Sequence, residues 1–196
     1  MKNCKDFYND SAKFWADNWY QNDNMLPYLK HLLKYIGKDN PKILDLGCGA
    51  GYESMRLKKL GASVIGIDFS EKELEIARER NTGINFYERD ILLSYKDLGR
   101  FDGIICVGVI VHFNDKELKQ VFKNMLEVLN KNGYLLLVFK EGNDYKKTSI
   151  YNNTEYDRNF IYHTRENILI AMNAEFEYVQ ELETTDTWKY LIYRKK

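Results

Sequence analysis

Short apolar runs alternate with helical patterns along most of the chain. A strand is expected where apolar residues run together and stop at glycine or polar residues, and a helix where they recur every three or four positions. The expected strands cover residues 42–46, 63–67, 84–87, 101–107, 134–139, 176–183 and 188–193. Their alternation with helices predicts a doubly wound α/β fold, a Rossmann-like, seven-stranded, mostly parallel sheet with helices on both faces. The last two strands are close together, which predicts a hairpin with an antiparallel last strand.

Some element ends carry local signals of their own. Ser70 and Glu73 have the spacing of a capping box, in which the hydroxyl and the carboxylate each accept from an orphan backbone N–H. Residues 115–129 carry an apolar stripe that is typical of a helix. Gly133 is predicted to form the turn before the strand over 134–139.

The whole chain, residues 1–196, is expected to form a single domain, because its length leaves little room for a second. Residues 1–40 are helical in pattern and rich in aromatic residues, and we expect them to form an N-terminal lid. Residues 41–140 carry the alternating pattern of a cofactor-binding core. Residues 141–196 are predicted to supply a substrate-side insert and the closing hairpin, with an irregular, polar stretch over 141–163.

The composition argues against several classes of function. The 29 basic residues balance the 29 acidic ones, which disfavours a nucleic-acid-binding or anionic-membrane surface. No apolar run reaches the ~20 residues that span a bilayer, and the first ten residues lack the apolar core of a secretory signal. Cys4, Cys48 and Cys106 lack the spacing of paired metal ligands, so no metal is expected, and a reducing compartment suits them. We expect a cytoplasmic monomer or homodimer with a small-molecule substrate.

The turn after the first predicted strand has the clearest chemical meaning. Its pattern is D-x-G-x-G-x-G, formed by Asp45, Gly47, Gly49 and Gly51. Glycines let the backbone turn sharply and let a ligand come close, at the edge where open α/β sheets bind ligands. A dinucleotide site needs G-x-G-x-x-G, and this spacing fails from either glycine. The carboxylate would repel a pyrophosphate, whereas it would attract the ammonium of a methionine moiety.

Acidic residues also follow the next two predicted strands. Asp68 lies about 20 residues past the first glycine, where a carboxylate can accept both hydroxyls of a ribose. An acid at this position is also typical of dinucleotide enzymes and of a helix first turn, so Asp68 alone does not discriminate. Asp90 is placed to accept from an adenine amino group, with Phe69 and Ile91 on the two faces of the ring.

In this order, the motifs resemble those of the class I S-adenosylmethionine-dependent methyltransferases. The resemblance covers roughly residues 40–140 and includes the strand over 101–107. It implies S-adenosylmethionine as the cofactor and S-adenosylhomocysteine as the product. The glycines would then pass under the methionine part, Asp68 would hold the ribose, and Val107 would line the floor near the sulfonium. It also implies that the last strand is inserted antiparallel beside the fifth.

The acceptor class is narrowed mainly by an absence. The N-P-P-Y motif does not occur in this sequence. In related enzymes this motif marks methyltransferases that modify amino nitrogens of bases and of glutamine, so a small molecule remains as the expected class of acceptor. His112 follows the fourth predicted strand and is a candidate general base; a packing histidine is an equally weighted alternative. Methyl transfer is an in-line displacement that depends mainly on positioning, so a base is needed only if the acceptor must lose its proton early. His163 is expected in a surface loop, and a place in a substrate-facing wall is the alternative.

Aromatic residues recur at helical spacing before the first strand. Tyr8, Trp15, Trp19 and Tyr20 are expected to line the acceptor pocket from a lid that closes over the cofactor. Helical aromatic stripes more often belong to a core, which is the alternative. The sequence thus predicts a methyltransferase that acts on a small molecule. A non-catalytic S-adenosylmethionine-binding protein and a dinucleotide-dependent oxidoreductase are the competing hypotheses.

Overall fold

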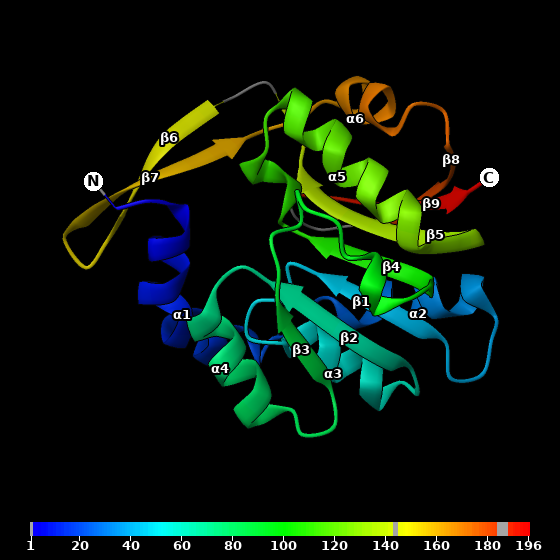
Figure 1. The fold of residues 1–196 in the computed structure, drawn as a ribbon, viewed down its shortest axis with the longest axis horizontal. Coiled ribbons are helices and arrows are strands. Elements are labelled where there is room, and N and C mark those ends of the chain that lie inside the picture. The colour runs from blue at the N-terminus through cyan, green and yellow to red at the C-terminus, as the bar shows by residue number, and fades with distance from the viewer. Residues whose placement is uncertain (1, 143–144, 184–187) are drawn as a thin grey trace.

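Helices cover both faces of a central sheet (Figure 1). The computed structural model describes residues 2–142, 145–183 and 188–196. The helices are α1 (Cys4–Trp19), α2 (Leu26–Ile36), α3 (Tyr52–Lys59), α4 (Glu71–Arg80), α5 (Asp115–Val128) and α6 (Arg165–Met172), with short 3-10 turns at Lys96–Leu98 and Ile110–His112. The strands are β1 (Lys42–Leu46), β2 (Ser63–Asp68), β3 (Asn85–Glu88), β4 (Phe101–Val107), β5 (Leu129–Lys140), β6 (Tyr145–Tyr151), β7 (Thr154–Ile161), β8 (Phe176–Glu181) and β9 (Trp188–Lys195). None of the described helices is both long enough and apolar enough to cross a bilayer.

The central sheet has seven strands in the order β3-β2-β1-β4-β5-β9-β8. The first five strands along the chain run parallel, and β9 pairs antiparallel with both β5 and β8. The predicted fold class, with its antiparallel strand beside the fifth, is confirmed. Because β1 lies between β2 and β4, the strand order reverses at this point of the sheet. Ligands of open α/β sheets bind beyond the carboxyl ends of the strands at such a reversal.

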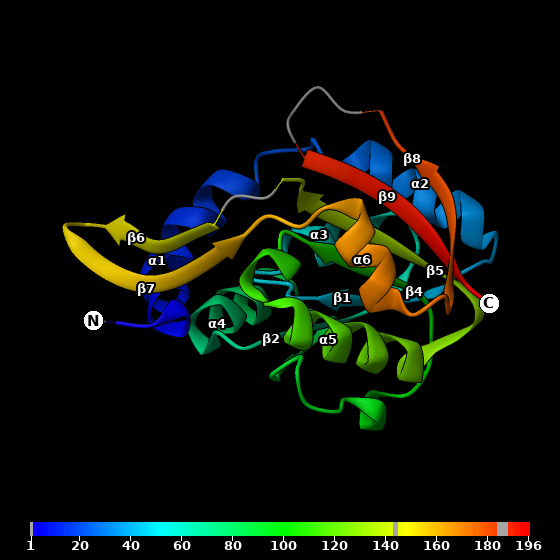
Figure 2. The ribbon, with the colours of Figure 1, turned by 90° about the horizontal axis from the view of Figure 1, so that it is seen from above.

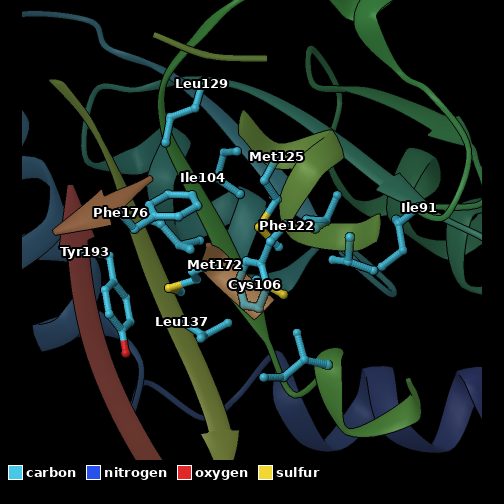
Figure 3. Close-up of a cluster of buried hydrophobic side chains, with 14 of the residues drawn as sticks. Ile91, Ile104, Cys106, Phe122, Met125, Leu129, Leu137, Met172, Phe176 and Tyr193 are labelled. Atoms are coloured by element: carbon cyan, nitrogen blue, oxygen red, sulfur yellow. The ribbon is translucent and has the colours of Figure 1, made fainter. Parts of the chain in front are cut away.

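Successive residues of the inner strands point to opposite faces and bury two apolar clusters. Ile104 belongs to the cluster that includes α5 and α6, whereas the next residue, Ile105, belongs to the cluster that includes α2, α3 and α4. Both side chains are fully buried. Figure 3 shows the first cluster, in which Phe122 and Met125 of α5 lie with Ile104. Strands covered on both faces are continuous apolar runs, which is why the sequence pattern reveals them.

Two elements lie beyond the carboxyl ends of the parallel strands: α1 and the β6–β7 hairpin (Figures 1 and 2). We call this pair the cover. The backbone N–H of Asp157 donates to the carbonyl of Lys2 (2.7 Å), and the rings of Phe7 and Tyr156 pack edge to face with centroids 5.3 Å apart. α1 also packs along α4, whereas α2 buries its apolar side against the central sheet.

Two local predictions are wrong. The segment 141–163, predicted to be irregular, contains the hairpin of β6 and β7. Asn152 and Asn153 connect the strands in left-handed backbone (φ 46° and 60°), which a two-residue hairpin turn requires. Gly133, predicted to be a turn, lies inside β5. The left-handed residue is Asn132 (φ 61°), in the part of β5 that precedes Gly133, where the pairing with β4 shifts register.

Candidate active site

The turn after β1 holds its glycines in backbone conformations that other residues avoid. Gly47, Gly49 and Gly51 have φ values of 73°, 49° and 80°. The backbone N–H of Gly47 donates to the carbonyl of Ile67 (2.8 Å), which ties the turn to β2. A Cβ on Gly47 would lie 2.3 Å from a methyl carbon of Val109. The spacing of the glycines is therefore dictated by the turn itself.

Two of the predicted carboxylates line this turn, and both are buried. Asp68 accepts from the backbone N–H groups of Gly49 and Ser70, at 2.9 Å each, and so holds the turn against the start of α4. Asp45 accepts from the hydroxyl of Ser54 on α3 (2.6 Å). Burial raises the pKa of Asp68, and it raises the pKa of Asp45 to about 7. Neither carboxylate forms an ion pair with a basic side chain in the described part of the chain.

A third carboxylate, which the sequence placed in a capping box, belongs to the same group. The hydroxyl of Ser70 does accept from the backbone N–H of Glu73 (3.3 Å). The reciprocal bond is not made, because Asp68 already occupies the backbone N–H of Ser70. Glu73 is 3% exposed, and its Oε2 has no hydrogen-bond partner. A Cβ on Gly49 would lie 3.6 Å from this oxygen, so the glycine leaves the space beside it open.

Electrostatics show that Glu73 is poorly stabilised as an anion. Burial, and next the charge of Asp68, raise its pKa to about 8, and the backbone amide of Ala50 offsets only part of this effect. Three buried acids, Asp45, Asp68 and Glu73, therefore surround a glycine turn. Among the described residues none of them forms an ion pair, and only the charge of Lys5 acts on Asp68, without direct contact. Such an arrangement is costly to the apo protein and is suited to a cationic ligand.

The residues predicted to enclose an adenine ring lie in different environments. Phe69 is partly exposed and packs edge to face against Tyr8 of α1 (5.9 Å between centroids). Asp90 is exposed and accepts from the backbone N–H of Leu92 (2.9 Å). Ile91 points into the apolar cluster of Figure 3, and Val107 is partly buried at the end of β4.

His112 lies under the cover in a chain of hydrogen bonds. Its Nδ1 is 2.7 Å from the carbonyl oxygen of Asn159, and because a carbonyl only accepts, Nδ1 carries the proton. Its Nε2 is 2.8 Å from the hydroxyl of Tyr8 and accepts from it. The Tyr8 oxygen in turn accepts from Nη2 of Arg158 (2.6 Å). Burial, the main cause, lowers the pKa of His112 to about 4, and burial raises that of Tyr8 to about 12. The imidazole is therefore neutral, with its Nε2 lone pair directed at a hydroxyl.

The four aromatic residues predicted to line the acceptor pocket do not gather in one place. At about 1.5 Å per residue, Tyr8 and Trp19 lie about 16 Å apart along α1. Tyr8 faces His112, whereas Trp19 stacks on Tyr52 near the glycine turn (6.2 Å). The Tyr20 hydroxyl donates to the carbonyl of Ala50 (2.6 Å). Trp15 lies between them on α1, and its indole nitrogen is buried without a partner. The aromatic residues of α1 thus span the candidate site from end to end.

Sequence reasoning missed three side chains of this region, namely Glu73, Tyr52 and Arg158. Each of them either had a plausible local structural role or lay in a segment without a regular sequence pattern. The isolated position of Arg158 in a polar, tyrosine-rich stretch was the one available signal. His163, which was predicted in a surface loop, is fully buried. Its Nε2 lies 3.0 Å from the carbonyl oxygen of Phe113 and 3.2 Å from that of Ile110. No group of potential metal ligands occurs among the described residues.

Two hollows on the surface lie away from the glycine turn. One is lined by Tyr28 of α2 and Leu182 after β8, and the other lies near the amino ends of the strands, beside Lys42 and Phe101.

Comparisons with known proteins place these features in a family. Residues 43–133 match the methyltransferase domain family. The chain is similar to the ubiquinone biosynthesis O-methyltransferase of Coxiella burnetii, with 31% identity over 139 residues, and to that of Pelagibacter ubique, with 36% identity over 101 residues. These matches cover 65% and 50% of this chain, and 57% and 41% of the two relatives. The chain thus spans about half the length of these curated relatives.

Solved structures agree over most of the chain. A crystal structure of a Pyrococcus horikoshii protein superposes with a TM-score of 0.73 at 27% identity, covering 89% of each chain. An S-adenosylmethionine-dependent methyltransferase of Methanosarcina mazei superposes with a TM-score of 0.69 at 20% identity, covering 86% of this chain and 97% of that one, and supports the fold alone. Residues 43–133, which include the glycine turn after β1, therefore form a methyltransferase domain, and in its sheet order and glycine turn the chain resembles the class I S-adenosylmethionine-dependent methyltransferases.

Proposed function

We propose that this protein transfers a methyl group from S-adenosylmethionine to an oxygen of a small molecule. The observation that carries the proposal is the group of buried, unpaired carboxylates at the glycine turn. Buried acids with raised pKa values attract a ligand that brings positive charge. The ammonium and the sulfonium of S-adenosylmethionine supply two such charges, whereas a dinucleotide would place its negatively charged pyrophosphate at the glycine turn. Relatives named as O-methyltransferases support oxygen as the accepting atom.

The residues at the turn fit this cofactor in kind and in placement. Glu73 offers an unpartnered oxygen beside Gly49, where an ammonium would complete its hydrogen bonding. Asp68 would exchange part of its backbone bonding for the ribose hydroxyls, and Phe69 would lie against one face of the adenine, whereas Ile91 would have to turn out of the apolar cluster to reach the other face. Asp45 would act from beneath the turn through its charge. When bound, the cofactor supplies a methyl group on a positively charged sulfur. The acceptor oxygen would bond to the methyl carbon as the carbon–sulfur bond breaks, and the sulfur would leave as a neutral thioether.

His112 and Tyr8 would take up the proton that the acceptor loses. Tyr8 receives the proton on its oxygen as it passes its own to Nε2 of His112, along the existing hydrogen bond of 2.8 Å. The Asn159 carbonyl keeps the other imidazole nitrogen protonated, so Nε2 is the basic atom. The same bond orients the ring, as expected of a positioned general base.

The cover would exclude water from the reaction. Its aromatic residues extend from His112 to the glycine turn, so closure would surround both the acceptor and the cofactor with apolar walls. Displacement reactions gain chiefly from fixing the two reactants in line, and a closed cover would hold them there. Opening and closing of α1 against the hairpin would accompany each turnover.

Calorimetric titration with S-adenosylhomocysteine tests the proposal. We expect saturable binding to the intact protein, and a loss of about 100-fold in affinity for Asp68→Ala, because two hydrogen bonds to a charged carboxylate disappear. Asp97→Ala is the matched control, since Asp97 is an exposed acid paired with Arg89, and it should bind as the unsubstituted protein does. Absence of binding, or equal affinity in all three proteins, would refute the proposed function.

A further inference from the structure

Arg158 of β7 is a guanidinium in the candidate site whose donors are only partly used. Nη2 donates to the Tyr8 hydroxyl (2.6 Å), and Nη1 makes a long contact with the Ser149 hydroxyl (3.4 Å). The thiol of Cys4, a weak acceptor, also lies beside it. The Nε–H is shielded from solvent and has no hydrogen-bond partner. A guanidinium has five N–H donors, so Arg158 has donor capacity left over.

A second arginine shows how this chain satisfies a buried guanidinium. Arg56 is 2% exposed, pairs with Asp23 and Glu53, and donates to the backbone carbonyls of residues 19, 20 and 22. Arg158 forms no ion pair with any carboxylate in residues 2–142, 145–183 and 188–196. A shielded cation without a counter-charge is unfavourable. Among the described residues, Arg158 therefore keeps donor capacity that a further partner could use.

The surroundings of Arg158 would strengthen binding of an anion. The guanidinium carbon lies 4.3, 5.0 and 5.3 Å from the ring centroids of Phe7, Tyr8 and Phe160. Aromatic faces stabilise a cation without occupying its N–H donors in the way an acceptor oxygen would. They also keep water away, and charges interact more strongly where water is excluded.

We propose that Arg158 binds a carboxylate of the acceptor, so that the methylated molecule is a small hydroxy acid. The planar guanidinium fork matches a carboxylate, and the unused Nε–H supplies one arm of a paired interaction. Arg158 and His112 bind the same Tyr8 hydroxyl, at 2.6 and 2.8 Å. The carboxylate and the reacting hydroxyl would therefore be held at two ends of one small molecule. This proposal rests on the proposed function.

Bound carboxylate would also favour the proton transfer. The charge of Arg158 is one of the causes that lower the pKa of His112, after burial. A carboxylate on Arg158 neutralises that charge and adds a negative one near the imidazole, so the pKa of His112 rises when the acceptor binds. The acceptor would then increase the basicity of the group that receives its proton.

NMR of the arginine Nε–H resonances tests the proposal without knowledge of the natural acceptor. The protein is first saturated with S-adenosylhomocysteine, which shows separately whether the cofactor binds. Benzoate, benzamide and inorganic phosphate are then titrated, and the Arg158 resonance is identified by its loss in Arg158→Lys. We expect benzoate to shift this resonance saturably, with a dissociation constant of about 10 mM or below. Benzamide should bind at least about tenfold more weakly, because it lacks the charge.

The variants decide between a binding role and a merely structural one. Arg158→Gln should abolish benzoate binding, and Arg158→Lys should weaken it about tenfold, because lysine keeps the charge but lacks the fork. Arg89→Gln, a substitution of an exposed, ion-paired arginine, should bind benzoate unchanged. The proposal is overturned if benzoate and benzamide act alike, if phosphate binds more tightly than benzoate, or if no saturable shift occurs. If Arg158→Gln fails to fold, the comparison of benzoate with benzamide on the unsubstituted protein still decides.

Discussion

The central sheet and the cover are built from different kinds of contact. In the sheet, Ile104, Ile105 and their neighbours are fully buried aliphatic side chains. In the cover, α1 and the hairpin meet through backbone hydrogen bonds, aromatic edges and hydroxyl groups, including the bond from Tyr156 to Asp10 (2.8 Å). Aliphatic packing provides most of the stability of a domain, whereas polar and aromatic contacts at a surface are more readily exchanged for water or ligand. We therefore expect the sheet to be the more rigid part of the fold and the cover to open more readily.

Two phenylalanines give the largest expected difference between these regions. Phe122→Ala empties a fully buried site in the core and should lower the free energy of unfolding by about 3–5 kcal/mol. Phe7→Ala in the cover should cost less than half of this, about 1–2 kcal/mol, because α1 can settle or detach locally. Urea unfolding measures both. Phe7→Ala should also speed hydrogen exchange in α1 and the hairpin and leave β1 and β4 protected. Equal losses of stability would place α1 in the core.

Glu73 should oppose stability and support binding. Its pKa of about 8 lies above the usual 4.5, so the folded state keeps a proton that the unfolded state has lost between these pH values. Stability is therefore lost as pH rises through this window, and Glu73→Gln should remove that loss. We expect the substitution to stabilise the ligand-free protein by up to about 4 kcal/mol more at pH 8 than at pH 5, and to weaken S-adenosylhomocysteine binding about tenfold.

The control for Glu73 lies on the same helix. Glu75 is an exposed acid paired with Lys72, and Glu75→Gln should change stability by less than about 0.5 kcal/mol at either pH. Thermal unfolding at pH 5 and pH 8 gives the comparison. If Glu73→Gln destabilises the protein at pH 8, its carboxylate serves the fold and the interpretation of the buried acids is wrong.

A smaller effect is expected where the cover is fastened to the glycine turn. Tyr20→Phe removes the hydrogen bond to the Ala50 carbonyl, and one to the side-chain amide of Asn81 (2.5 Å). The cost should be about 1–2 kcal/mol, because each of the two bonds usually contributes about 1 kcal/mol. Hydrogen exchange should become faster at the carboxyl end of α1 and not at Phe7. Uniform loosening of α1 would show that the helix opens as one unit, and no change would show that this attachment contributes nothing.

The sequence predicted the support better than the cover for a physical reason. Strands buried on both faces are continuous apolar runs, so β1 and β4 could be recognised residue by residue, and β5 in its apolar part. β6 and β7 are polar and partly exposed, and only the two asparagines of their turn hint at a hairpin. The glycine turn was predictable because steric crowding at Gly47 excludes every residue that has a side chain.

The side-chain interactions of the candidate site were not predictable in the same way. Glu73 fitted a capping box, and only the structure shows that Asp68 has already taken the backbone N–H it needed. The bonds from Tyr8 to His112 and Arg158 join residues more than a hundred positions apart in the chain. No local pattern encodes such a contact, whereas a strand or a capped helix is encoded in neighbouring residues.

In this account the buried acids at the glycine turn receive the ammonium group of the ligand's methionine-derived part. Calorimetry of S-adenosylhomocysteine binding at pH 7, in two buffers that differ in ionisation enthalpy, tests it most directly. At this pH Glu73 is largely protonated and Asp45 partly so, and the ligand's ammonium should drive them to ionise. We predict saturable binding with net release of about one proton, much reduced in Glu73→Gln. Absence of binding, or binding that releases no proton and is unaffected by Glu73→Gln, would contradict the account.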